Sequence, residues 1–261
     1  LNECKFPPLR LNFRRGTLLG SPFEGQNKLK LVTQCRRQSK YRDYLALEYT
    51  IYRIFNLISE KSLRVRWLDI VYRDSAKKNR EASPPGFLIE DVGRAAQRLG
   101  LQELKTDSLK AQSLDSTHAT QVALFNYFLG NTDFSPIAAA AGEDCCHNQA
   151  LLAPADGLHY TIPYDFDRTG WVNAPYATPN PRFRIRSVRQ RLYRGRCVNN
   201  KHLDASLQLF REHRDEIDAL VKEQPGLTPA TRRYLLKYSN AFFRIIDNPR
   251  KIDRAIVRNC I

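Results

Sequence analysis

The acidic and amide side chains between residues 131 and 173 are the best suited in the chain, by type and spacing, to perform chemistry. Asp133 lies in a polar turn after an apolar helical stretch, Asn148 opens a short apolar run, and Asp165 and Asp167 follow a second run. Mg²⁺ takes oxygen ligands, usually a few carboxylates or amides together with phosphate oxygens and water. Phosphoryl transfer asks a protein mainly to position groups and neutralise charge. One Asn and one or two carboxylates at strand ends suit that task.

The same residues also have a plainer interpretation. Asp and Asn are common in turns, so Asp133 as a turn residue and the acidic pair as a solvated strand end fit the spacing equally well. Asp144, just before Asn148, is a second candidate for a catalytic base. The spacing by itself leaves these alternatives open.

Local patterns predict the elements that would hold these residues. The turn sequence at 154–157 lies between apolar runs at 149–153 and 158–164, which predicts a hairpin that ends at the acidic pair. Upstream, a helix is expected from about Ser116 to Leu129, with Ser116 or Thr117 as its N-cap. Gly130 is the expected stop, since glycine often ends helices.

The N-terminal part predicts a small antiparallel sheet over residues 6–34, because 9–13 and 27–34 alternate with period two. Lys28, Lys30 and Val32 would share one face. A lysine that projects from such a strand can reach phosphates, and an edge strand protected by lysines is the alternative.

The remaining periodicity predicts an α+β protein. The expected elements are a helix at 41–58 that contains Glu48, strands at 65–74 and 86–92 joined by a polar loop at 75–85, a helix at 93–104, and helices at 203–224 and 228–248.

Composition limits the class of protein without choosing its partner. The chain has 261 residues, 42% of them hydrophobic, and a formal net charge of +15. It is long enough for one large domain or two lobes, and it contains no apolar run of the ~18 residues needed to span a membrane. The charge favours an anionic partner such as a nucleotide, a nucleic acid, a lipid or an acidic protein. The chain begins at Leu1 and has no Met, which indicates a processed product and leaves a removed targeting segment and the compartment open.

Six cysteines without Cys-x-x-Cys spacing permit disulfides, and the adjacent pair Cys145-Cys146 permits redox chemistry. A transition-metal site built from this pair with His147 and His159 is also conceivable. Adjacent ligands on one short loop are awkward for tetrahedral Zn²⁺, which makes this the weakest reading.

Seven Arg lie in residues 182–196. This segment follows the acidic pair, so an anionic or acidic substrate held near Arg182–Arg196 is one expectation. Nucleic-acid binding is less favoured, because the segment has few aromatic residues to stack on bases. A solvated basic helix is the plainest alternative.

The stretches GNTD (130–133), HN (147–148) and IPYDFD (162–167), in this order, resemble the atypical kinase-fold proteins that include the spore-coat CotH-type and the HipA-type kinases. The resemblance also covers KLKLVTQC with the helix after it and GFLIEDV, and it spans roughly residues 9–197. It implies a bilobal protein-kinase-like fold, with a small antiparallel-sheet N-lobe at 1–91 and a mostly helical C-lobe at 92–261. The catalytic hairpin would lie at 131–167.

The resemblance also implies a role for each matching residue. Lys30 would contact nucleotide phosphates, Glu48 would pair with it, and Glu90 would lie where the nucleotide pocket meets the hinge. Asp133 would orient or deprotonate the acceptor hydroxyl. The metal ligands would be Asn148, Asp165 and Asp167.

The expected function is therefore an atypical kinase that uses ATP with Mg²⁺ or Mn²⁺ and transfers phosphate to a protein or other hydroxyl acceptor. An insertion at 136–146 separates Asp133 from Asn148 more widely than in protein kinases. The alternatives are an inactive kinase-like scaffold and a protein that binds nucleic acid or another anionic partner through residues 182–196.

Overall fold

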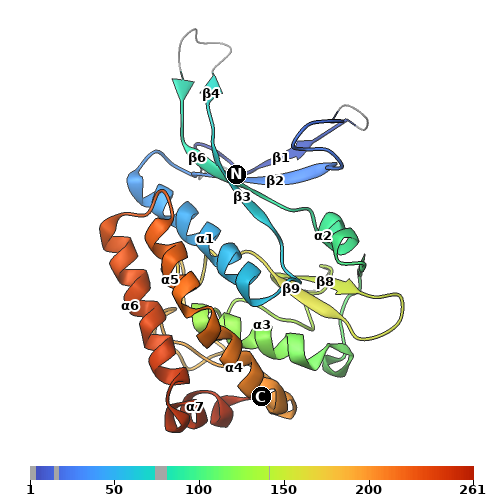
Figure 1. Cartoon of the computed structure of the whole chain (residues 1–261), viewed down its shortest axis with the longest axis vertical. Coiled ribbons are helices and arrows are strands. Elements are labelled where there is room, and N and C mark those ends of the chain that lie inside the picture. Colours follow the sequence, from blue (N-terminus) through green and yellow to red (C-terminus); the bar gives the residue numbers. More distant parts are fainter. Residues whose placement is uncertain (1–3, 15–17, 74–80, 141) are drawn as a thin grey trace.

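The computed structural model of the chain describes residues 4–14, 18–73, 81–140 and 142–261. These residues form an α+β fold, in which a small antiparallel sheet lies at one end of the molecule and most of the helices lie toward the other (Figure 1). The expected α+β class is confirmed. The kinase-like arrangement of two lobes stays a prediction.

The main sheet has four strands, each antiparallel to its neighbours, in the order β1 (Leu9–Asn12), β2 (Lys28–Thr33), β6 (Pro85–Ile89) and β3 (Val65–Asp69). The pairing of β1 with β2 confirms the expected N-terminal sheet. Alternation along β2 places Leu29 and Leu31 on the outer face, where they pack with Leu88.

Helix α1 (Ser39–Ile58) packs against the inner face of this sheet. The ring of Tyr49 lies 5.4 Å from that of Trp67 and 5.5 Å from that of Phe87, measured between centroids. Val32 pairs with Phe87, so Lys30, two residues earlier on β2, also belongs to the inner face. The sheet thus presents Lys30 on the side where α1 lies.

Beyond the sheet, the strand expected at 65–74 divides into β3 and a short β4 (Tyr72–Arg73), which pairs with β5 (Glu81–Ala82). The connection expected at 75–85 falls partly on residues 74–80, outside the described residues. The helix expected at 93–104 is shorter, because α2 (Val92–Arg98) ends before Gly100 adopts a left-handed conformation with φ of 67°. Strand β7 (Gln102–Glu103) follows.

Helix α3 (Ser116–Leu129) has the expected bounds, and Gly130 ends it in the left-handed conformation with φ of 65°. The N-cap expectation is wrong. Asp115 is the cap, because its carboxylate accepts a hydrogen bond of 2.7 Å from the backbone N–H of His118. The expected hairpin is confirmed as β8 (Gln149–Ala153) paired with β9 (Tyr160–Pro163), and β7 extends it to a three-stranded sheet.

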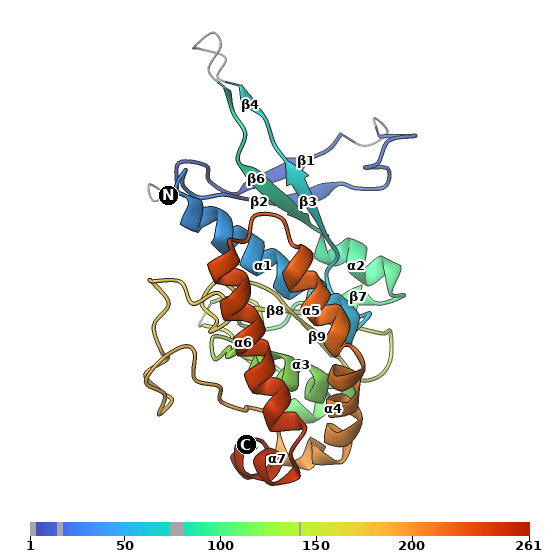
Figure 2. The same cartoon turned by 60° about the vertical axis from the view of Figure 1, so that its left-hand side comes forward.

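The C-terminal part contains α4 (Leu203–Glu212), α5 (Arg214–Glu223), α6 (Pro229–Ile246) and α7 (Pro249–Ala255). The single helix expected at 203–224 is wrong, since the chain breaks at His213. Phe210 and Ile217, on either side of the break, are both buried. The helical spacing of apolar residues therefore continues across His213, and the sequence pattern gives no sign that the helix ends there. Helix α5 packs beside α1, and α6 packs against α5 (Figure 2). The described residues also form three short 3₁₀ turns: η1 (Ala111–Ser113), η2 (Cys197–His202) and η3 (Val257–Asn259).

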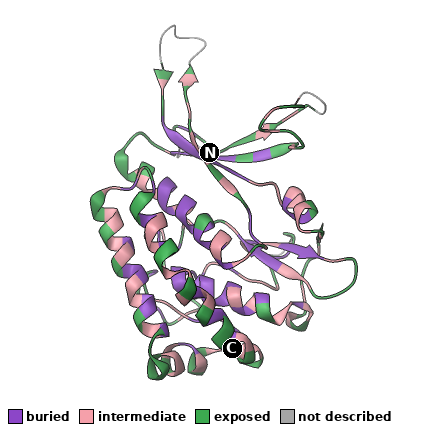
Figure 3. Ribbon diagram, viewed as in Figure 1, coloured by how far each residue is buried: buried purple, intermediate pink, exposed green. Residues whose placement is uncertain are grey.

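One large buried cluster joins these elements. It includes Phe87 of β6, Phe55 of α1, Phe125 of α3 and Phe242 of α6, and Figure 3 shows the buried positions running from the sheet into the helices. The cluster crosses residue 91, so the division into 1–91 and 92–261 stays a prediction.

All six cysteines are in disulfides, which pair Cys4 with Cys35, Cys145 with Cys146, and Cys197 with Cys260. A zinc site that uses Cys145 and Cys146 as thiolates is therefore excluded while this bond is intact.

Among the described helices, none combines the length and the apolar character that crossing a membrane requires.

Candidate functional site

The loop that carries Asp133 is held by side chains on both sides. The backbone N–H of Asp133 donates to Oδ1 of Asn131 over 2.9 Å, and the Nδ2 of Asn131 donates to Oδ1 of Asn126 in α3 over 2.8 Å. Arg194 donates to the carbonyl oxygens of Thr132 at 3.2 Å and Phe134 at 2.7 Å. These contacts fix the backbone immediately before and after Asp133.

The carboxylate of Asp133 has two further partners from the start of the hairpin. Nε2 of His147 lies 2.9 Å from its Oδ1, and Nδ2 of Asn148 lies 3.4 Å from its Oδ2. Asn148 also donates to the carbonyl oxygen of Asp133 over 2.7 Å. The insertion at 136–146 therefore leaves Asp133 and Asn148 in direct contact.

The hairpin then brings Asp165 to the same place. The N–H of Tyr164 donates to the carbonyl oxygen of Asn148 over 3.1 Å. Asp165 has a φ of 59° and its N–H donates to the hydroxyl of Tyr52 in α1 over 3.3 Å. Asn and Asp tolerate this left-handed conformation better than most residues. Asn148, Asp165 and α1 are thereby connected.

Glu48 lies at the centre of this region. The pKa of its carboxyl is raised to about 8, mainly by burial and also by the charges of Asp165 and Asp167, while the ammonium of Lys30 opposes the increase. Residues from β2, α1 and the end of the hairpin are thus electrostatic neighbours. Within the described part of the chain, however, Lys30 and Glu48 do not form a direct ion pair.

Asp167 completes the group. Burial and the nearby Asp165 raise its pKa, Asp133 adds to this effect, and a hydrogen bond from the hydroxyl of Tyr176 opposes it. The pKa of Tyr176 is raised in turn, by burial and by the charge of Asp167. The region therefore concentrates carboxylates whose mutual repulsion favours a cation between them.

A cavity of about 320 Å³ opens beside these residues, between the inner face of the sheet and the hairpin. Lys30, Tyr52 and Tyr164 line it, together with Arg10, Lys28, Leu63, Ile89, Glu90, Asp91 and Val92. A more polar hollow of about 580 Å³ shares Arg10, Lys28, Asp91 and Val92 with it. The two hollows form one groove, in which Arg10, Lys28 and Lys30 supply positive charge.

Glu90 lies at the edge of this groove with its carboxylate already engaged. It forms an ion pair with Arg98, with Oε2 at 2.8 Å from Nη2, and it accepts from the backbone N–H of Arg64 over 3.0 Å. Asp144, the other candidate base, instead forms an exposed ion pair with Lys105 at 3.5 Å. Asp133 rather than Asp144 therefore lies with the other acidic residues.

The arginine-rich segment has two distinct parts. The segment forms turns and irregular backbone, so the alternative of a solvated basic helix is wrong. Arg191 and Arg194 point inward: Arg191 donates to carbonyl oxygens of Phe128 and Tyr238, and Arg194 packs over the rings of Phe134 and Phe183. Arg182, Arg184, Arg186 and Arg189 are exposed.

Sequence reasoning missed the roles of His147, Tyr176 and Arg194. His147 is adjacent to Asn148, but no spacing rule marks a histidine as the partner of an aspartate fourteen residues earlier. Tyr176 and Arg194 lie in irregular segments without periodicity. Only their contacts identify them.

No protein-family model matches the chain, and no curated protein is significantly similar to it. The resemblance to atypical kinases therefore stays a prediction that depends on the order of short motifs.

Proposed function

We propose that the protein is a phosphotransferase of the atypical-kinase type, which uses ATP with Mg²⁺ or Mn²⁺ and phosphorylates a hydroxyl group on a protein or other acceptor. The observation that carries the proposal is the electrostatic proximity of Lys30 and Asp165 to Glu48, beside a groove that Lys30 lines. These residues come from three separate parts of the chain. A shared functional site would explain why the Glu48 carboxylate is mostly buried beside the carboxylates of Asp165 and Asp167.

The donor set suits a hard divalent cation. Asp165 and Asp167 offer carboxylate oxygens, and Asn148 uses its Nδ2 on Asp133, which leaves its amide oxygen for another partner. No three His, Cys, Asp or Glu side chains of the described residues already form a complete metal site. Magnesium typically needs only one or two carboxylates when substrate phosphates supply other ligands. A cation bound here would neutralise charge on the transferred phosphoryl group.

Asp133 would accept the proton of the acceptor hydroxyl. The contacts of its Oδ1 with His147 and of its Oδ2 with Asn148 limit the rotation of its carboxylate. A positioned base of this kind typically contributes 10²–10⁴-fold to the rate.

Lys30 would hold phosphates together with Arg10 and Lys28, which line the same groove. The negative charge of bound phosphates would then compete with Glu48 for the Lys30 ammonium. Exposed Arg182, Arg184 and Arg186 follow the acidic pair in sequence, and they support an anionic or acidic acceptor.

The proposal is tested by calorimetric titration of ATP with Mg²⁺, with Mn²⁺ and with EDTA. We expect saturable binding that needs the divalent cation and is lost in Asp165→Ala. Asp156→Ala, in the exposed turn of the same hairpin, is the matched control and should bind like the wild type. Binding that is unaffected by Asp165→Ala would reject the site. Absence of binding under all conditions would leave an inactive scaffold.

Nucleic-acid binding is the second candidate, and the four exposed arginines at 182–189 favour it. It predicts affinity that falls steeply with salt. A labelled oligonucleotide at low salt measures this, and no binding there would exclude it.

A further inference from the structure

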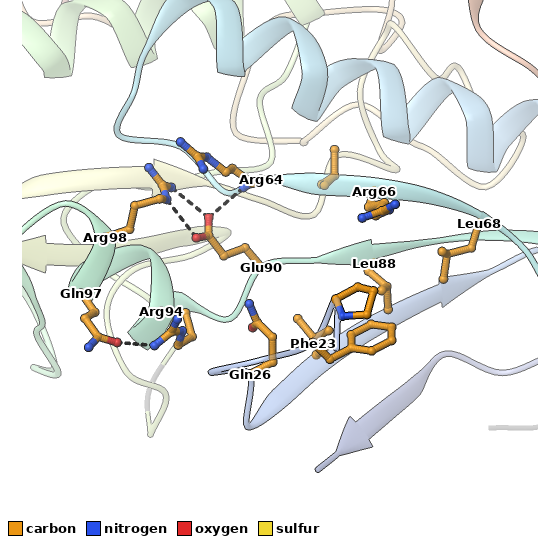
Figure 4. A pocket seen from close by; sticks show the side chains of 13 residues that line it. Phe23, Gln26, Arg64, Arg66, Leu68, Leu88, Glu90, Arg94, Gln97 and Arg98 are labelled. Carbon is orange, nitrogen blue, oxygen red and sulfur yellow. Dashed lines mark hydrogen bonds and ion pairs between the residues drawn. The ribbon is translucent and has the colours of Figure 1, made fainter. Parts of the chain in front are cut away.

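The outer face of the main sheet, opposite to Lys30, forms a wall of a second cavity of about 620 Å³ (Figure 4). This volume lies within the range of ligand-binding pockets. The floor is apolar: Leu88 comes from β6, Leu68 from β3, and Phe23 from the connection between β1 and β2, and Pro22 and Leu29 complete it. Helix α1 packs on the opposite face, and α2 borders this one through Arg94, Gln97 and Arg98.

Arginines surround this floor. Arg66 lies on β3, Arg64 immediately precedes it, and Arg94 lies on α2 (Figure 4). The side chains of Arg64 and Arg66 are exposed and have neither a hydrogen bond nor an ion pair with any described residue. Among the described residues, Arg94 hydrogen-bonds to the neutral amide of Gln97 and has no ion pair, whereas Arg98 is neutralised by Glu90 at 2.8 Å. The pocket therefore carries an uncompensated positive charge.

Two further features call for hydrogen-bond partners. Gln26 lines the pocket, and its Oε1 is buried and has no hydrogen-bond partner among the described atoms. Buried acceptors are almost always paired in folded proteins. In addition, β3 pairs only with β6, which leaves its other edge open in the described sheet. An open edge offers backbone N–H and C=O groups to an added strand.

We propose that this outer-face pocket binds an extended segment of a partner protein that combines acidic and apolar residues. Its carboxylates would pair with Arg64, Arg66 and Arg94, and its apolar side chains would cover the leucine floor. Its backbone would supply an N–H donor for Gln26 and for the open edge of β3. An anionic amphiphile such as a fatty acid could pair with the arginines and cover the apolar floor, but it has no N–H group to donate to Gln26. The peptide accounts for all the features.

The proposal does not depend on the proposed phosphotransfer, because the pocket lies on the face opposite to Lys30, although Glu90 borders both hollows. The probe is a short, capped, fluorescent peptide of alternating glutamate and leucine, and anisotropy measures its dissociation constant. We expect saturable binding that weakens by roughly 10-fold or more in Arg66→Glu and by about 5-fold in Gln26→Leu. Arg250→Glu, an exposed arginine on α7, is the charge-matched control and should leave binding unchanged.

Three results would overturn the proposal. The first is no saturable binding by the wild type. The second is an equal loss of affinity in Arg250→Glu, which would indicate attraction to net charge alone. The third is binding of sodium dodecanoate, but not the peptide, in a manner that depends on Arg66. Thermal unfolding of each variant confirms folding, and Arg64→Glu replaces Arg66→Glu if that variant is unfolded.

Discussion

Nε2 of His147 lies 2.9 Å from Oδ1 of Asp133, at opposite ends of the connection between α3 and β8. Asp133 ends the turn after α3, whereas His147 precedes β8. The contact joins the two ends of the insertion at 136–146, and it orients the carboxylate of Asp133, the proposed catalytic base. His147 is therefore a positioning residue for Asp133.

Replacing His147 with Gln should lower kcat for phosphotransfer by roughly 10-fold, because the variant loses the hydrogen bond that orients the Asp133 carboxylate. KM for ATP should stay within error, because His147 does not line the nucleotide groove. Steady-state kinetics separates the two constants. His213→Gln, at the junction of α4 and α5, is the control. A rise in KM at constant kcat would assign His147 to binding instead.

The raised pKa of Glu48, about 8 against an ordinary 4.5, predicts a specific pH dependence of stability. Between these values the folded protein retains a proton that the unfolded chain has released. Stability is therefore greatest below the ordinary pKa and falls as pH rises toward the folded-state value. Glu48→Gln removes this loss, so at pH 8 its Tm should exceed that of the wild type by about 3–6 °C.

Thermal unfolding of wild type and Glu48→Gln from pH 4 to pH 9 measures this difference. The two Tm values should converge at the acidic end, where Glu48 is neutral in both states. Parallel curves over the whole range would show that Glu48 is not protonated in the folded protein.

Arg194 supports the catalytic loop through hydrogen bonds to the carbonyl oxygens of Thr132 and Phe134 and through the rings of Phe134 and Phe183. A lysine keeps the charge but loses the planar group that makes these contacts. Arg194→Lys should cost about 2 kcal/mol of unfolding free energy and should also lower kcat. Urea unfolding measures the former, with exposed Arg186→Lys as control. Equal stabilities of the two variants would contradict this role.

The disulfide between Cys197 and Cys260 closes a loop of 63 residues and ties the C-terminus to η2. In the chain-entropy model, such a crosslink stabilises a protein by about 4 kcal/mol. Replacing both cysteines with serine should lower the unfolding free energy by a comparable amount. The Cys4–Cys35 pair, 31 residues apart, should contribute about 0.6 kcal/mol less. A loss below about 1 kcal/mol for the longer loop would contradict the entropic argument.

The sequence by itself determined the elements whose signals are local. The bounds of α3 follow from apolar periodicity that ends at Gly130, and the β8–β9 hairpin follows from turn residues between two apolar runs. Alternation along β2 was sufficient to assign Lys30 to a face. These predictions succeed because neighbours in the chain decide the conformation.

Tertiary structure decided what depends on distant partners. Asp115 rather than Ser116 caps α3, because the Asp115 carboxylate accepts the hydrogen bond from the backbone N–H of His118. The pairing of six cysteines, which allows 15 connectivities, depends on which parts of the chain meet. Arg191 and Arg194 turn inward because carbonyl groups from remote segments accept their hydrogen bonds. The electrostatic interaction of Glu48 with Lys30 and Asp165 likewise exists only once the sheet, α1 and the hairpin have packed together.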